Sequence, residues 1–156
     1  MEAIVFGNIT LDVLCYPVED VPRNESTAFE KGIVSPGGSG SNTAIGLCAL
    51  EVLTALVGRI GNDEAAWLVK STWDQTGLDQ RYIKRDPDQH TAISVGLVDR
   101  SAQPRFIHTP GANANLTIDD LDLTALKTMG AKMNRFKFSN KAAGSRPRGY
   151  GHIPHH

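Results

Sequence analysis

Short apolar runs predict the buried strands of a sheet. Residues 2–6 and 53–60 are rich in aliphatic side chains, and both runs end close to a glycine. Continuous apolar runs of this length are too short for helices and are typical of strands that are buried on both faces. A further apolar piece covers residues 11–16, and a short strand is predicted over residues 82–84.

Two helices are predicted between the strands. The small and apolar residues of 41–50 are typical of a helix that packs closely on a sheet, and residues 64–73 have helical spacing of their apolar side chains. Glycine at position 77 is suited to the turn after the second helix. The candidate N-caps are Ser41 or Asn42 for the first helix and Asn62 or Asp63 for the second.

The order of these elements predicts the fold class. Strand, glycine turn, helix and strand follow one another, which indicates an α/β domain with a mainly parallel sheet. Alternating segments at 27–34, 91–98 and 105–109 do not fit this order. They predict a small antiparallel flap beside the main sheet, with residues 99–104 as a hairpin turn. Residues 118–126 are expected to form a short helix.

Composition is that of one globular domain. Of the 156 residues, 40% are hydrophobic and 21% are charged, which excludes a collagen-like or wholly disordered chain. No stretch approaches the ~20 apolar residues that span a bilayer, and the first residues lack the features of a signal peptide. Two cysteines, Cys15 and Cys48, favour a reduced, cytoplasmic protein over a disulfide scaffold.

Charge divides the chain into two parts. Residues 1–126 hold all 17 acidic residues and nine of the 16 basic ones, a formal charge of −8, whereas residues 127–156 carry +7. A basic end of this kind is typical of a nucleic-acid-binding tail, or of a segment foreign to the domain before it. Because apolar periodicity also stops near residue 127, we expect residues 127–156 to be disordered.

The glycine cluster at residues 35–40 is the strongest local feature. Glycines let a ligand approach the backbone, and free N–H groups at the start of a helix favour oxyanions or hydroxyl-rich ligands. No Gly-Lys-Ser/Thr follows, so the cluster is not a Walker A loop, and its spacing is not that of a dinucleotide-binding turn. A flexible turn from strand to helix would use the same residues.

Asp12 is the second candidate. It lies five residues after the glycine that ends the first strand, near the sheet edge where ligands of parallel sheets gather. There its carboxylate is able to accept hydrogen bonds from sugar hydroxyls, although a solvated loop acid or a helix cap would look the same in sequence. His90 and His108 lack a Cys or His partner at metal-ligand spacing and are interpreted as ordinary polar residues.

Four motifs give these features a common origin. In chain order they are GNITLD at 7–12, PGGSGSNTA at 36–44, VGRIGNDE at 57–64 and PGANA at 110–114. Through them, residues 2–126 resemble the ribokinase-like (pfkB) carbohydrate kinases. The resemblance implies part of a Rossmann-like ribokinase fold, with a small β lid over the sugar. It also implies transfer of the ATP γ-phosphoryl to a sugar or nucleoside hydroxyl, with Mg²⁺.

The resemblance also assigns a sugar pocket. Asp12 would bind sugar hydroxyls, and the strands at 91–98 and 105–109 would belong to the lid. The remaining pocket residues would be Thr10, Gly38, Ser39, Gly40 and Asn42. Thr10 stands where ribokinases usually have Asn, and Ser39 replaces a common Lys, so ribose is not assigned as the sugar.

The second half of the family pattern is absent. Asn-x-x-Glu, which the family places near magnesium and the phosphates, and Gly-Ala-Gly-Asp, which supplies the base and the anion hole, do not occur in the 156 residues. Phosphoryl transfer depends on such positioning and charge stabilisation. We therefore hypothesise a truncated kinase, inactive alone and without catalytic, ATP-binding or metal-binding residues of its own. The alternatives are a non-catalytic sugar-binding module and a half-protein that needs a complementary C-terminal chain.

Three further expectations follow from the resemblance. In residues 127–156, the abrupt charge change favours a wrong reading frame or a broken gene over a nucleic-acid-binding tail. Missing later strands would leave a sheet edge and an apolar face uncovered, so we expect self-association through the lid or that edge. The family usually has Gly near Glu51, after the first helix, so we expect either a left-handed conformation there, at a cost of about 1 kcal/mol, or a different turn.

Overall fold

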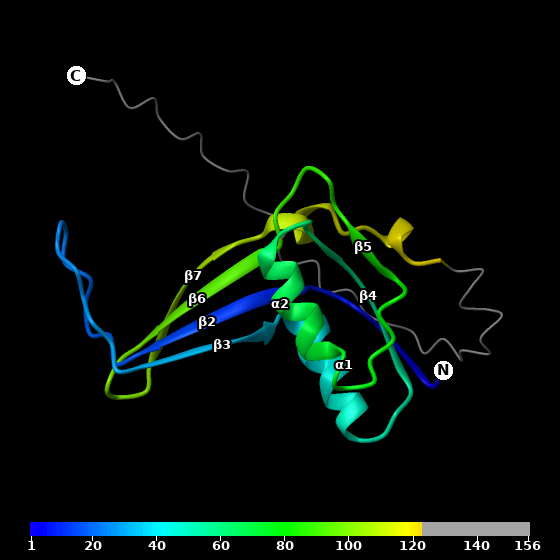
Figure 1. The fold of residues 1–156 in the computed structure, drawn as a ribbon, viewed down its shortest axis with the longest axis horizontal. Helices are drawn as coiled ribbons and strands as arrows, with labels where there is room; N and C mark the ends of the chain where they lie inside the picture. Colours follow the sequence, from blue (N-terminus) through cyan, green and yellow to red (C-terminus); the bar gives the residue numbers. More distant parts are fainter. Residues whose placement is uncertain (123–156) are drawn as a thin grey trace.

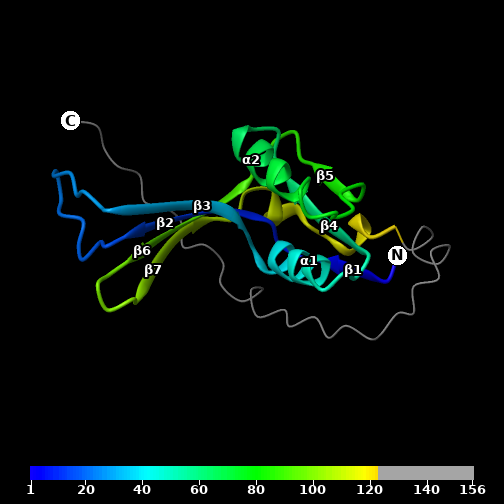
Figure 2. The same ribbon diagram turned by 60° about the horizontal axis from the view of Figure 1, so that its bottom comes forward.

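The computed structural model describes residues 1–122, in which the strands form two separate sheets. A parallel sheet in the order β1-β4-β5 contains β1 (Ala3–Phe6), β4 (Thr54–Ile60) and β5 (Ile83–Arg85). A second sheet, here called the lid sheet, has the order β3-β2-β6-β7 and contains β2 (Thr10–Tyr16), β3 (Lys31–Gly37), β6 (Ala92–Val98) and β7 (Pro104–Thr109). The lid sheet projects from the remainder, here called the body (Figures 1 and 2).

Two helices and two short 3₁₀ turns complete the body. Helix α1 (Ser39–Ala49) packs against β1 and β4, and α2 (Glu64–Trp73) lies against β2 and β3. The 3₁₀ turns are η1 (Gly111–Asn115) and η2 (Ile118–Asp120). The predicted cap of α2 at Asp63 is confirmed, because its Oδ1 accepts a hydrogen bond from the Ala66 N–H at 2.9 Å.

The predicted cap of α1 is wrong. Gly38 occupies the N-cap position and no side chain caps the helix, so neither Ser41 nor Asn42 has that role. Ser41 is instead fully buried, and its hydroxyl oxygen accepts a hydrogen bond from the Trp73 Nε1–H at 3.2 Å. The residue that suggested a cap thus pairs with the indole in the core, since a buried indole N–H requires an acceptor.

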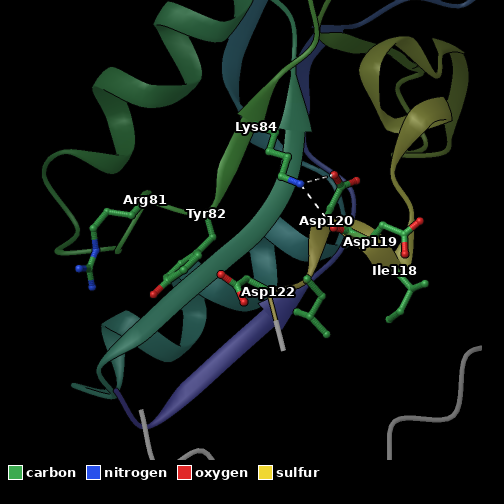
Figure 3. Close-up of a pocket in the computed structure, with 8 residues that line it drawn as sticks. Arg81, Tyr82, Lys84, Ile118, Asp119, Asp120 and Asp122 are labelled. Carbon is green, nitrogen blue, oxygen red and sulfur yellow. Dashed lines mark hydrogen bonds and ion pairs between the residues drawn. The ribbon is translucent and has the colours of Figure 1, made fainter. Parts of the chain in front are cut away.

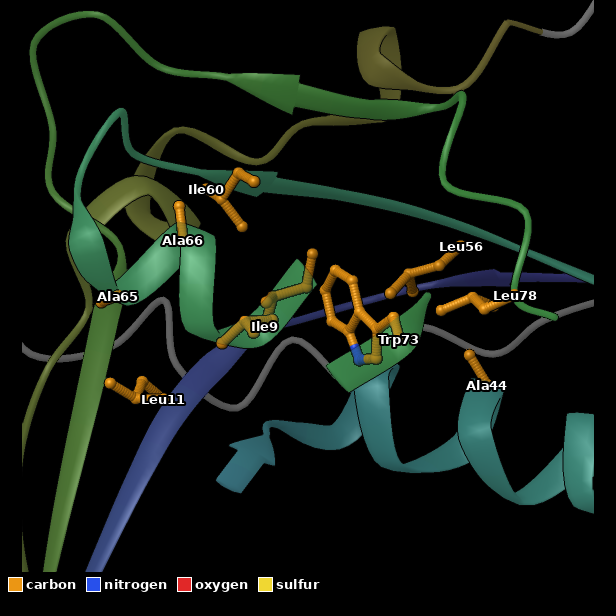
Figure 4. Close-up of a cluster of buried hydrophobic side chains, with 10 residues drawn as sticks. Ile9, Leu11, Ala44, Leu56, Ile60, Ala65, Ala66, Trp73 and Leu78 are labelled. Atoms are coloured by element: carbon orange, nitrogen blue, oxygen red, sulfur yellow. The ribbon is translucent and has the colours of Figure 1, made fainter. Parts of the chain in front are cut away.

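The core lies between α1, α2 and β4. Every residue of β4 except Arg59 is buried, as expected of a strand paired on both sides. Trp73 of α2 is fully buried at the centre of the cluster (Figure 4). The cluster comprises Ile9, Leu11, Ala44, Leu56, Ile60, Ala65, Ala66, Val69, Trp73 and Leu78. Ile9 and Leu11 bring the start of the lid sheet into this core, so the lid is anchored where β2 begins.

The α/β fold class is confirmed, with two differences in the lid sheet. The strand predicted at 27–34 is wrong in its bounds: residues 27–30 are exposed outside any strand, and β3 continues to Gly37 because Thr10 pairs with Gly37. The lid sheet is also not wholly antiparallel, since β2 and β6 run parallel. Pro36 lies in β3, an edge strand, where a proline is tolerated.

The C-terminal predictions are tested only in part. The helix expected over 118–126 is a single 3₁₀ turn, Ile118–Asp120, as far as the described residues extend. A capping box at Thr117 and Asp120 closes this turn. Residues 123–126, and every expectation for 127–156, lie outside the described residues.

Glu51 takes the left-handed conformation, one of the two expected for it. Its φ is +61°, and its N–H donates to the Cys48 carbonyl at 2.9 Å, while the Val52 N–H donates to the Leu47 carbonyl at 3.1 Å. These two bonds form a Schellman motif, which usually has Gly at this position because a Cβ is strained at positive φ. Helix α1 therefore ends in a Schellman motif that has Glu51 at the left-handed position, where the family usually has Gly.

We predict that Glu51→Gly raises the free energy of unfolding by about 1 kcal/mol, because it relieves this strain. Urea unfolding of the full chain, followed by circular dichroism, measures the effect. Ala49→Gly is the matched control: it adds Gly at a helical position and should lower the free energy of unfolding by about 0.5 kcal/mol. Equal effects of the two substitutions would contradict the strain at Glu51.

Candidate functional site

Asp12 and Thr10 form a local pair on one face of the lid sheet. Both lie in β2, two residues apart, so their side chains share a face. The Thr10 hydroxyl donates a hydrogen bond to Asp12 Oδ1 at 2.6 Å, and both residues are half-buried. This bond uses one acceptor position and orients the carboxylate, which keeps further lone pairs for a hydroxyl-bearing ligand.

Gly37 provides the space that the carboxylate occupies. Gly37 pairs with Thr10 across the β2–β3 ladder, and a Cβ at this position would overlap the carboxylate of Asp12. Any residue with a side chain would therefore displace Asp12. Gly37 belongs to the glycine cluster at residues 35–40 but was not among the predicted site residues, and the β2–β3 pairing reveals its role.

The remaining predicted site residues lie at the start of α1. Gly38, with φ +88°, and Gly40 are packed against the backbone of residues 7–9, where a Cβ on either glycine would overlap main-chain atoms. Ser39 and Asn42 are exposed on the first turn of α1. Thr10, Asp12, Gly38 and Gly40 thus meet at the junction of lid and body, whereas Ser39 and Asn42 border that junction.

Two N–H groups of this helix start, those of Gly40 and Ser41, are already bonded, contrary to the expectation of free N–H groups from sequence. Those of Gly40 and Ser41 both donate to the Asn8 carbonyl, at 3.0 and 3.2 Å, and that of Asn42 donates to the Gly38 carbonyl at 2.9 Å. The glycines therefore serve a close crossing of two backbone segments rather than an open anion cradle. A ligand here would be held by side chains such as Asp12.

Three polar residues that the sequence analysis did not assign to a site share the face of Asp12. Asp12 pairs with Ser35 of β3 and with Ser94 of β6, and Ser94 pairs in turn with His108 of β7. Directly paired residues point to the same face, so these four side chains form one polar row across the lid sheet. Strand alternation would have revealed the row, but only with the register between strands.

A separate open pocket lies on the body. It has a volume of about 670 Å³ and is lined by Arg81, Tyr82, Lys84 and residues 118–122 (Figure 3). None of the six predicted site residues contributes to it. Lys84 Nζ lies 3.1 Å from Asp120 Oδ1 and donates to the Asp119 carbonyl at 3.5 Å. Within this pocket, the charge of Lys84 is thus paired with that of Asp120.

Asp120 anchors the 3₁₀ turn η2 to the sheet. Arg59 donates two hydrogen bonds to its carboxylate, each at 2.8 Å, and a third to Asp86 at 3.3 Å. The hydrogen bonds from Arg59 hold the pKa of Asp120 far below its ordinary range, despite burial. The same carboxylate raises the pKa of Arg59. We interpret this network as stabilising the fold rather than binding a ligand, because each of its charged groups is bound to another side chain.

A family comparison identifies the chain. The profile described as pfkB family carbohydrate kinase matches residues 2–133. The chain belongs to the pfkB family of carbohydrate kinases. The match ends seven residues beyond the boundary expected at residue 126, which itself stays a prediction.

Known pfkB relatives are considerably longer than this chain. It is 27% identical over 106 residues to the fructokinase of Vibrio alginolyticus, covering 67% of this chain and 33% of that protein. It is 29% identical over 126 residues to fructokinase-1 of Zea mays, covering 80% of this chain and 38% of that protein. The chain therefore spans between a third and two fifths of these relatives.

Solved structures confirm the ribokinase fold of the pfkB chain. Ribokinase from Thermotoga maritima superposes with a TM-score of 0.69 at 26% identity, over 81% of this chain and 42% of that one. Arabidopsis thaliana ribokinase, solved with ribose and ATP, has a TM-score of 0.65 at 26% identity, over 72% of this chain and 36% of that one.

The described part of the pfkB chain contains neither a metal-binding cluster nor a membrane-spanning helix. Residues 1–122 hold no group of three or more His, Cys, Asp or Glu side chains placed to bind a metal ion. No helix among them is both long and apolar enough to cross a membrane.

Proposed function

We propose that this chain is the sugar-binding part of a carbohydrate kinase. It would hold a sugar, or a nucleoside-like molecule, between the polar row of the lid sheet and the first turn of α1. The observation that carries the proposal is Asp12, a half-buried carboxylate oriented by Thr10 and accommodated by Gly37. Asn42 and Ser39, exposed on α1, would form the opposite wall.

The chemistry of this face suits a polyol. A carboxylate only accepts hydrogen bonds, so Asp12 would take two hydroxyl donors of the sugar. Ser35, Ser94 and His108 add groups that both donate and accept. Fructose is our first choice of sugar, because fructokinases are among the relatives and because Thr10 and Ser39 depart from the ribokinase pattern.

We further propose that this chain does not complete phosphoryl transfer by itself. The described residues do not fit ATP or Mg²⁺: no carboxylate cluster is placed for a metal, and two of the first N–H groups of α1, those of Gly40 and Ser41, are already bonded to the Asn8 carbonyl. No step of transfer is therefore derived for these residues. The nucleotide and the metal of the family reaction would be held by the C-terminal part found in longer relatives.

Removing the charge of Asp12 should weaken sugar binding strongly. We expect Asp12→Asn to weaken the binding of fructose by about 100-fold, because hydrogen bonds to a charged acceptor contribute about 1.5–3 kcal/mol. Isothermal titration of the full chain with fructose, ribose and a nucleoside measures this. Asp88→Asn, at an exposed acid outside the polar row, is the matched control and should bind as the wild type does. Unchanged affinity of the Asp12 variant would contradict the proposed site.

A second expected result concerns catalysis. With ATP, Mg²⁺ and a sugar panel, the chain alone should form no sugar phosphate above a mock preparation. Adding the separately expressed C-terminal part of a pfkB fructokinase should restore turnover if the chain is a half-protein. The open edge of β1, which pairs only with β4 among the described strands, is suited to receive a strand of that partner. Formation of sugar phosphate by the chain alone would contradict the proposal that it does not complete phosphoryl transfer by itself.

The outcome also separates the two alternatives. Restored turnover favours the half-protein, with the C-terminal part alone as the control for its own activity. Sugar binding without restored turnover favours a non-catalytic binding module.

Self-association through the lid sheet is the third expected result. On the face opposite Asp12, Val34, Val13, Val95 and Ile107 are paired in one row across all four strands. Val34 and Ile107 are 57% and 66% exposed, so a second copy of the chain would cover them. Sedimentation velocity at tens of micromolar should show dimers or larger species. Val34→Lys should dissociate them, whereas Leu50→Lys, at an exposed site on the body, should not.

A further inference from the structure

The lid sheet joins the body at one end only. Strand β2 begins there at Thr10 and β6 at Ala92, while β3 ends there at Gly37 and β7 at Thr109. The register places these ends together, since Thr10 pairs with both Gly37 and Ala92 (Figures 1 and 2). Asp12 lies two residues beyond this base. Any group that fixes the base therefore also fixes the place of Asp12 relative to the body.

Thr91 makes three hydrogen bonds at the base of the lid sheet. It immediately precedes β6 and is fully buried. Its hydroxyl donates to Asp63 Oδ1 at 2.7 Å and accepts from the Gly61 N–H at 3.0 Å, and its N–H donates to Asp63 Oδ2 at 2.7 Å. One side chain thus links the lid sheet to the end of β4 and to the start of α2.

Asp63 is shared between the lid and the helix. The carboxylate that caps α2 through Ala66 is also the acceptor of both Thr91 bonds. Burial raises the pKa of Asp63, but the hydrogen bonds from Thr91 and Ala66 outweigh it and hold the pKa below its ordinary value. The carboxylate is therefore ionised, and its hydrogen bonds to Thr91 are of the stronger, charge-assisted kind.

A second contact fixes the segment that enters β2. Ile9, the residue before β2, donates its N–H to Asn113 Oδ1 at 3.1 Å and accepts from Asn113 Nδ2 at 2.8 Å. Gly111 lies against the His90 carbonyl with no space for a Cβ, so η1 is packed directly on the segment that enters β6. The base is thus held by specific bonds on both of its central strands, β2 and β6.

We propose that Thr91 and Asp63 are positioning residues that set the angle at which the lid sheet leaves the body, and thereby the place of Asp12 over the first turn of α1. The inference rests on the proposed sugar site. Thr91 acts through Asp12 and touches no ligand itself. Removing its hydroxyl cuts two of the three bonds while leaving the buried volume nearly unchanged.

Residual dipolar couplings of the ¹⁵N-labelled full chain test the angle directly. In the wild type, amides of the lid sheet and of the β1-β4-β5 sheet should fit one alignment tensor. In Thr91→Val the lid amides should require a separate tensor of smaller magnitude, and Thr91→Ser should restore the single tensor. Thr54→Val is the matched control, because Thr54 is a buried threonine of the body whose hydroxyl bonds only within its own turn, to the Val52 carbonyl.

Sugar titration of the same variants tests the consequence for Asp12. We expect Thr91→Val to bind about tenfold more weakly, or about 1.4 kcal/mol, and Thr91→Ser and Thr54→Val to bind as the wild type does. A Thr91→Val lid that keeps the single tensor would overturn the proposal, as would a loosened lid with unchanged affinity. If the wild type binds no sugar, the proposed function fails, and the couplings still decide whether Thr91 sets the angle.

Discussion

The close crossing of two backbone segments is the constraint on which the rest of the structure depends. Gly38 and Gly40 lie directly against residues 7–9, and the Asn8 carbonyl accepts two N–H groups of α1. A side chain at either glycine would separate the segments. Residues 7–9 lead from β1 into β2. This contact therefore fixes the positions of the lid sheet, helix α1 and the parallel sheet β1-β4-β5 relative to one another. Glycine here provides proximity rather than flexibility.

The candidate site is a consequence of that placement. Once β2 leaves the crossing, its alternation directs Thr10 and Asp12 to one face, and pairing with β3 places Gly37 beneath the carboxylate. The pairing of β2 with β6 then adds Ser94 to the same face. The pfkB family relationship is the reason a sugar is the proposed ligand, and the donors and acceptors on this face are of the kind that would suit a polyol.

The sequence predicted those features that depend on neighbouring residues. Asp63 as a cap follows from local stereochemistry, the left-handed turn at Glu51 was expected from the Gly that the family has there, and the structure contains both. The glycine cluster was located correctly, but the bonding of the Gly40 and Ser41 N–H groups was not predicted, because their partner is the carbonyl of the distant Asn8. Likewise, Ser41 suggested a cap until Trp73 was seen to need its hydroxyl. Register between strands was the other missing information, so Gly37 and the polar row were not foreseen.

The alternation of the lid sheet separates two surfaces in a simple way. In β2, β6 and β7 the even-numbered side chains, such as Asp12, Ser94 and His108, share the face of the polar row, whereas odd-numbered ones, such as Val95 and Ile107, share the opposite face. A single substitution in these strands therefore changes the face of the proposed sugar site or the face of the proposed self-association, but not both. An insertion or deletion of one residue within a strand would exchange the two surfaces beyond that point. A change in strand length would thus disturb both faces of the lid sheet, whereas a replacement disturbs only the face on which it lies.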